Sequence, residues 1–79
     1  MSLNITAKYD ETFFKVYINR VLHFAIRLEV FDSVQSWINV EKPRKYSIEI
    51  YRKEGEPILL EYDSLIKWEK ILSLIDKYL

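Results

Sequence analysis

Few residues in this chain are of the types that perform catalysis or bind metal ions. The 79-residue sequence has one histidine, His23, and no cysteine. A general base must act on a partner group, and a structural zinc site needs about four ligands, mostly from His and Cys. His23 lies in an alternating segment beside Arg27, which indicates an ordinary strand residue. We therefore expect no metal site, no cofactor and no catalytic role for His23.

Acidic and hydroxyl side chains give no catalytic pattern either. The pairs Asp10–Glu11 and Glu54–Glu56 fall at predicted turns, where carboxylates usually bind nearby backbone N–H groups. Ser64 lies between a predicted strand and a predicted helix, but the glycines of a nucleophile elbow are absent. Helix capping accounts for Ser64 without a catalytic role. The sequence predicts a protein that is not an enzyme.

Basic and aromatic residues are interleaved between Glu41 and Pro57, a mixture that suits nucleic-acid binding. The segment holds five bases and four acids. The carboxylates repel the phosphates that the bases would bind, so the pattern indicates the solvated side of a β-hairpin. Lys42, Arg44 and Lys45 remain as a local basic loop. This loop is the candidate contact for a lipid headgroup or nucleic acid, although we expect neither a nucleic-acid partner nor a membrane-surface partner.

Alternation of apolar and polar residues at period two continues from the start of the chain to about Tyr62, which predicts antiparallel strands. Turns are predicted at Asp10–Glu11, at Asn19–Arg20 and at Gly55, because Asn and Gly tolerate positive φ. The clearest strand covers residues 22–30. Its predicted apolar face consists of Leu22, Phe24, Ile26, Leu28 and Val30.

One segment, Asp32–Val40, fits two patterns. Asp32 followed by Gln35 resembles the capping box that begins a helix. However, Val34 and Ile38 also belong to a period-two alternation of the kind found in strands. We favour the strand and leave the short helix open.

The last seventeen residues, 63–79, have the spacing of an amphipathic helix with Asp63 or Ser64 as N-cap. A helix of this length is marginal alone in water, so its apolar stripe must dock on the sheet. Trp68 is predicted to be a central core residue. The stripe consists of Leu65, Trp68, Leu72, Ile75 and Leu79, widened by Ile71 and Tyr78.

These elements predict one α+β domain over residues 1–79. Residues 1–62 would form an antiparallel meander of five to six strands, and the helix of residues 63–79 would pack on its apolar face. A chain this small, without a disulfide, has little stability to spare. Its formal net charge of zero provides no general repulsion between copies.

Aromatic residues are the strongest indication of an interaction surface. If the alternation is interpreted correctly, Phe13, Tyr17, Trp37 and Tyr51 lie on the face of the sheet away from the helix. Large exposed apolar patches usually mark interfaces. The alternatives are that the rings pair across strands within the sheet, or that a curved sheet closes over both faces.

The segment from Lys45 to Leu79 resembles the end of small bacterial pleckstrin-homology-like domains, which finish with a strand, a glycine turn, a strand and one amphipathic helix. The preceding segment from Phe31 to Glu41 is similar to the strand before that hairpin in such domains. The resemblance covers roughly the second half of the chain, and the chain is one strand short of the usual seven. It implies a non-enzymatic scaffold that binds proteins or lipid headgroups.

The sequence thus predicts a small non-catalytic interaction module that forms a homo-oligomer, most simply a dimer, or binds another protein. Contact through the sheet face and pairing through an open sheet edge both remain open. The alternative is binding of a lipid headgroup or nucleic acid through the loop of Lys42, Arg44 and Lys45. The chain start lacks the pattern of a secretory signal and no apolar run approaches the length of a membrane span, so we expect a cytoplasmic protein.

Overall fold

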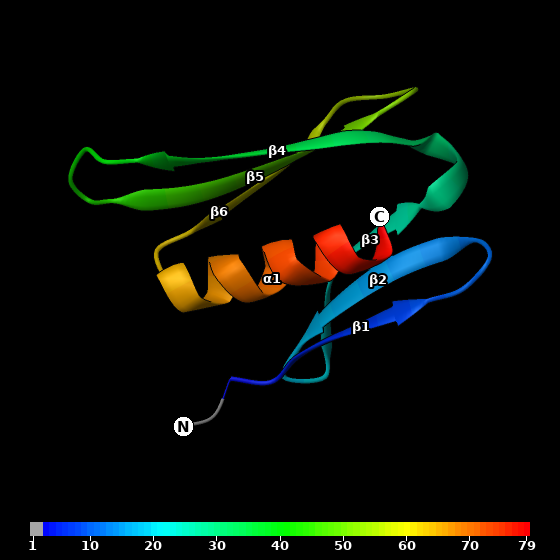
Figure 1. The fold of residues 1–79 in the computed structure, drawn as a ribbon, viewed down its shortest axis with the longest axis horizontal. Helices are drawn as coiled ribbons and strands as arrows, with labels where there is room; N and C mark the ends of the chain where they lie inside the picture. The colour runs from blue at the N-terminus through cyan, green and yellow to red at the C-terminus, as the bar shows by residue number, and fades with distance from the viewer. Residues whose placement is uncertain (1–2) are drawn as a thin grey trace.

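The computed structural model describes residues 3–79 as six β-strands and one C-terminal α-helix (Figure 1). This confirms the predicted α+β class, the strand count and the C-terminal helix. Residues 32–39, for which a short helix was the alternative, belong to a strand. The elements are β1 Ile5–Tyr9, β2 Phe13–Ile18, β3 Val21–Arg27, β4 Phe31–Asn39, β5 Lys45–Arg52, β6 Ile58–Tyr62 and α1 Leu65–Tyr78.

The strands form two antiparallel sheets of three, ordered β1-β2-β3 and β4-β5-β6, so the prediction of one continuous meander is wrong. The break is at Leu28–Val30, a single 3-10 turn that the sequence pattern had placed inside a strand. The backbone before this turn is hydrogen-bonded to the first sheet, and the backbone after it is hydrogen-bonded to the second. The Leu28 N–H donates to the Thr12 carbonyl at 2.8 Å, whereas the Lys53 N–H donates to the Val30 carbonyl at 2.7 Å.

The predicted turns are confirmed. Asn19 and Arg20 have φ of 50° and 71°, as a two-residue hairpin turn requires, and Gly55 has φ of 88°. At the first turn the Asp10 carboxylate accepts hydrogen bonds from the N–H groups of Thr12 at 2.7 Å and Phe13 at 2.8 Å. These bonds hold the pKa of Asp10 below its usual value, with the Phe13 bond as the largest cause.

A β-bulge changes the predicted face of β3. Phe24 pairs with Val16 but Leu22 pairs with Tyr17, so His23 is an extra residue without a partner on β2. A bulge of this kind reverses the alternation beyond it. Phe24 is therefore buried, whereas Leu22 is 52% exposed and does not belong to the predicted apolar face.

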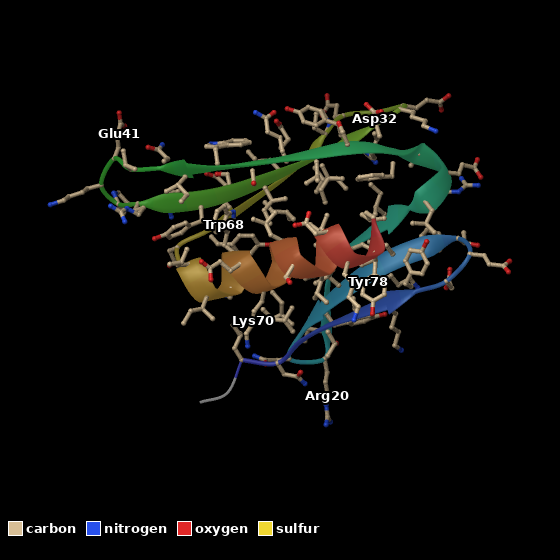
Figure 2. All side chains as sticks on the ribbon, in the orientation of Figure 1. Arg20, Asp32, Glu41, Trp68, Lys70 and Tyr78 are labelled. Atoms are coloured by element: carbon tan, nitrogen blue, oxygen red, sulfur yellow. The ribbon has the colours of Figure 1, made fainter. Side chains whose placement is uncertain are left out.

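Helix α1 lies between the two sheets and contacts β1 of one sheet and β5 and β6 of the other (Figure 1). It begins after Ser64, whose side chain accepts a hydrogen bond from the Lys67 N–H at 3.2 Å, so Ser64 is the N-cap. Trp68 lies near the start of the helix and Tyr78 near its end (Figure 2). Trp68 contacts β5, whereas Tyr78 stacks on Tyr9 of β1 with ring centroids 5.5 Å apart.

The core is shared by both sheets and the helix. From α1 it receives Ile71 and Ile75, which are completely buried, whereas the predicted stripe residue Leu65 is 43% exposed. Trp68 is half-buried rather than central. The other buried apolar residues are Phe14, Val16, Phe24, Ile26, Tyr46, Ile48, Ile50 and Tyr62.

Candidate functional site

The four aromatic residues of the predicted interface do not form one patch. Phe13 and Tyr17 lie on β2, on the side away from the buried Phe14, whereas Trp37 and Tyr51 lie on β4 and β5. The first pair belongs to one sheet and the second pair to the other. A single partner surface made of all four would need one continuous sheet, which the turn after β3 prevents.

Tyr51 is occupied within its own sheet. Its hydroxyl lies within hydrogen-bonding distance of the Glu49 carboxylate and 3.1 Å from Oε1 of Gln35 on the neighbouring strand. The hydrogen bond to Glu49 is the main reason why the pKa of Tyr51 is raised. This side chain contributes to the cross-strand pairing that was the alternative interpretation of the aromatic residues.

The strongest candidate for a contact surface is strand β4, which forms an edge of the second sheet. Trp37 points to the outer face of that sheet and is 39% exposed. Ile38 points to the inner face, which α1 covers over β5 and β6, and is 44% exposed. The edge therefore carries exposed apolar side chains on both of its faces.

The basic loop is a small exposed feature. Lys42 and Arg44 are exposed, and Lys45 is half-buried as the first residue of β5. The basic residues Arg52 and Lys53 lie at the other end of β5, roughly 23 Å from Lys45 at about 3.3 Å per residue. There Arg52 donates to the Glu56 carbonyl, from Nε at 2.9 Å. The bases between Glu41 and Pro57 thus form no continuous stripe.

His23 has a role that the alternation did not reveal. The bulge directs its ring to the same side as Phe24, and the Nε2 atom lies 2.6 Å from the Tyr62 hydroxyl. Burial lowers the pKa of His23, and the positive charge of Lys67 lowers it further. Burial raises the pKa of Tyr62. The pair links β3 of the first sheet to β6 of the second.

The described part of the chain offers no enclosed site. No pocket is formed by residues 3–79. Within the same residues, no three His, Cys, Asp or Glu side chains are gathered closely enough to hold a metal ion. The helix of this region is also too short and too polar to cross a membrane.

Comparison with protein-family models, with curated proteins and with solved structures found no match to this chain.

Proposed function

We propose that this chain is a small non-catalytic interaction module that pairs with a second copy of itself through strand β4. The observation that carries the proposal is the open edge of β4. This is the longest strand, and two of its own residues, Trp37 and Ile38, are exposed on its two faces. An unprotected edge presents unpaired N–H and C=O groups that another strand can bind. The resemblance of the second half to pleckstrin-homology-like domains agrees with a non-enzymatic scaffold.

The other edge strands are less suited to pairing. Strand β3 carries the bulge at His23, and bulges interrupt the regular hydrogen-bonding pattern of an edge. Strand β6 has five residues and follows directly on Pro57. Strand β1 also has five residues, one of them the exposed Lys8, and α1 packs against it.

Strand β4 lacks these protective features over most of its length. Its register shift lies between Phe31 and Ser33, so residues 33–39 are regular. The only charged residue in the strand is Asp32, at its start, and the strand contains no proline. Antiparallel pairing of two copies about a two-fold axis would place Asp32 of one copy opposite the other end of the partner's strand. No like-charge pair would form.

Pairing at β4 would also cover side chains that α1 leaves exposed. The helix contacts β5 and β6 of this sheet, so Ser36 and Ile38 on the same face of β4 stay open to solvent. A second β4 strand would place cross-strand neighbours beside Ile38 on this face and beside Trp37 on the other. Both contacts remove apolar area from water, which favours association.

The decisive experiment is sedimentation velocity at micromolar concentration. We expect a species of twice the 9.6 kDa chain mass, and a single species at the chain mass would contradict the proposal. Two variants separate edge pairing from contact through the outer sheet face. Ser36→Lys places a charge in the middle of the edge, on the side opposite the outer face, and should yield monomers. Leu59→Glu places a charge on the outer face of β6, where Leu59 is 51% exposed, and should leave an edge dimer intact.

The reverse result, with Leu59→Glu monomeric and Ser36→Lys dimeric, would assign the contact to the outer face and refute edge pairing. Both positions are exposed in the single chain, so neither charge has to be buried in the fold. Circular dichroism of each variant, compared with that of the unaltered chain, verifies that folding is retained.

A further inference from the structure

The net charge of zero conceals a charge difference between the two sheets. The strands β1, β2 and β3 contain three bases, Lys8, Lys15 and Arg27, and no acid. The strands of the second sheet hold the acids Asp32, Glu49 and Glu61 together with the bases Lys45 and Arg52. A local field of one sign can attract a polyanion even where the whole chain is neutral.

All three bases lie on the outer face of the first sheet, together with two aromatic residues. Residues 13, 15 and 17 alternate with the buried residues Phe14 and Val16, so they point away from the core. Lys8 pairs directly with Lys15, and Phe13 pairs with Arg27. We call this surface the basic face; it consists of Lys8, Phe13, Lys15, Tyr17 and Arg27.

The direct pairing of Lys8 with Lys15 is unfavourable by itself, because like charges opposite each other in a sheet repel. Each ammonium group lies near a ring: Nζ of Lys8 is 5.5 Å from the Tyr17 centroid, and Nζ of Lys15 is 5.4 Å from that of Phe13. These contacts offset part of the repulsion. A bound anion between the two amines would remove the rest.

Acids flank the basic face after β3 and in the turn between β1 and β2, which contains Asp10 and Glu11. The Glu29 carboxylate is 3.7 Å from the Arg27 guanidinium. Asp10 lies in the turn before β2, where its carboxylate binds the N–H groups of Thr12 and Phe13. The charge of Lys15 also helps to lower the pKa of Asp10, so this amine is not remote from every acid. Within residues 3–79, however, neither Lys8 nor Lys15 forms an ion pair, which leaves both amines able to bind an external anion.

Aromatic and basic side chains alternate along the outer face of β2, as nucleobases and phosphates alternate along a single nucleic-acid strand. Phe13 and Tyr17 lie four residues apart on one face, which is about 13 Å at about 3.3 Å per residue. Lys15 and its partner Lys8 lie midway between them. Phe13 is 37% exposed and the Arg27 side chain is 56% exposed, so both are accessible. Aromatic rings that flank basic side chains are the usual means of binding single strands.

We propose that the basic face binds single-stranded nucleic acid. The nucleobases stack on Phe13 and Tyr17, and the phosphates are bound by Lys8, Lys15 and Arg27. Stacking requires unpaired bases, which a duplex does not offer. An anionic membrane could take up the charges and the rings, but it would not require the two rings at this spacing. This site is separate from the β4 edge and does not depend on self-association.

Binding of the full chain to a fluorescent oligothymidylate of about eight nucleotides, measured by anisotropy at about 50 and 200 mM salt, tests the proposal. We expect binding that weakens with salt. The double variant Lys8→Gln/Lys15→Gln should reduce the slope of log affinity against log salt by about 1.4, because each phosphate contact contributes about 0.7 for single strands. Phe13→Leu should weaken binding by about five-fold or more at both salt concentrations, as expected for the loss of one stacked base.

Three comparisons make the result specific. An abasic strand with the same number of phosphates should bind more weakly than oligothymidylate, because it cannot stack. A duplex of the same length should also bind more weakly. The matched control Lys42→Gln/Arg44→Gln also removes two positive charges, from the exposed loop, and should leave affinity unchanged.

The proposal is overturned if the loop variant abolishes binding while the double lysine variant does not. It is equally overturned if the abasic strand or anionic vesicles bind as tightly as oligothymidylate, or if no binding occurs at the lower salt concentration. The double lysine variant removes a repulsive pair, so it should be at least as stable as the unaltered chain, and a change in its affinity would not result from unfolding.

Discussion

The Nε2 atom of His23 lies 2.6 Å from the phenolic oxygen of Tyr62, so a hydrogen bond joins edge strand β3 of the first sheet to edge strand β6 of the second. Tyr62 is 6% exposed, and its hydroxyl has this ring as its partner. Burial lowers the pKa of His23 and the nearby Lys67 adds to the effect, so the folded chain favours the neutral imidazole.

This shift predicts that stability decreases in weakly acidic solution. Because the folded pKa of His23 is lower than its unfolded value of about 6.5, the free energy of unfolding is highest above that pH. It should fall as the pH decreases from about 6.5 to the folded pKa, by at most about 1.4 kcal/mol per pH unit for one proton. Urea unfolding at about pH 7.5 and about pH 5.5 measures the difference.

His23→Gln should remove this pH dependence, because the imidazole is gone and burial raises the pKa of the remaining partner, Tyr62, further above neutral pH. Lys67→Gln should reduce it, since Lys67 is the second cause of the shift. Asp10 does not interfere, because its pKa is lowered from 3.8 and it titrates below this window. If the His23→Gln variant lost as much stability between about pH 7.5 and about pH 5.5 as the unaltered chain, the pH dependence would come from other groups.

Gly55 is predicted to be required for the turn between β5 and β6. Its φ of 88° lies in the region that L-residues avoid. Gly55→Ala should therefore lower the free energy of unfolding by about 1–2 kcal/mol. Gly55→Asn should cost less, because asparagine adopts positive φ more readily. Denaturant unfolding of the two variants measures the difference, and equal stability of Gly55→Ala and the unaltered chain would contradict this account of the turn.

The strands and the helix could be predicted from the sequence because period-two and helical patterns are local. The hairpin around Gly55 and the cap at Ser64 are local in the same way. The division into two sheets was not predictable from the alternation. Leu28 and Val30 continue the pattern of β3 in sequence, yet the chain turns there, and the direction of a turn depends on distant hydrogen-bond partners.

The candidate site was harder to predict for the same reason. The extra residue in β3 leaves no mark in the amino-acid pattern, so the pattern predicts a core position for Leu22, which is exposed, and does not predict the bond from the exposed His23 to Tyr62. Lys8 and Lys15 are seven residues apart in the sequence, and only the β1–β2 register places them opposite each other. The open edge of β4 likewise becomes visible only when its neighbours are known.

Removal of metal ions is predicted to leave the fold unchanged. The chain contains one histidine and no cysteine, so a structural metal site would have to consist mainly of carboxylates. The thermal unfolding midpoint should be the same with and without a chelator in excess. A large decrease on chelation would reveal a metal that stabilises the folded chain.

Trp68 provides the most direct test of how α1 docks. Its ring lies 5.5 Å from that of Tyr46 between centroids, and its Nε1 donates to the Ser47 carbonyl at 3.0 Å. Trp68→Ala removes both the ring contact and the hydrogen bond. Because Trp68 is half-buried, we expect a loss of about 3 kcal/mol, at the lower end of the range for large aromatic residues.

Trp68→Phe separates the two contributions, because it keeps an aromatic ring but removes the donor to Ser47. It should cost only about 1 kcal/mol, the usual net value of one hydrogen bond. Ile71→Ala, at a completely buried position one turn further along the helix, is the matched reference and should cost about 2–5 kcal/mol. Urea unfolding measures all three. If Trp68→Ala were as stable as the unaltered chain while Ile71→Ala was destabilised, the first turns of α1 would not be docked on β5.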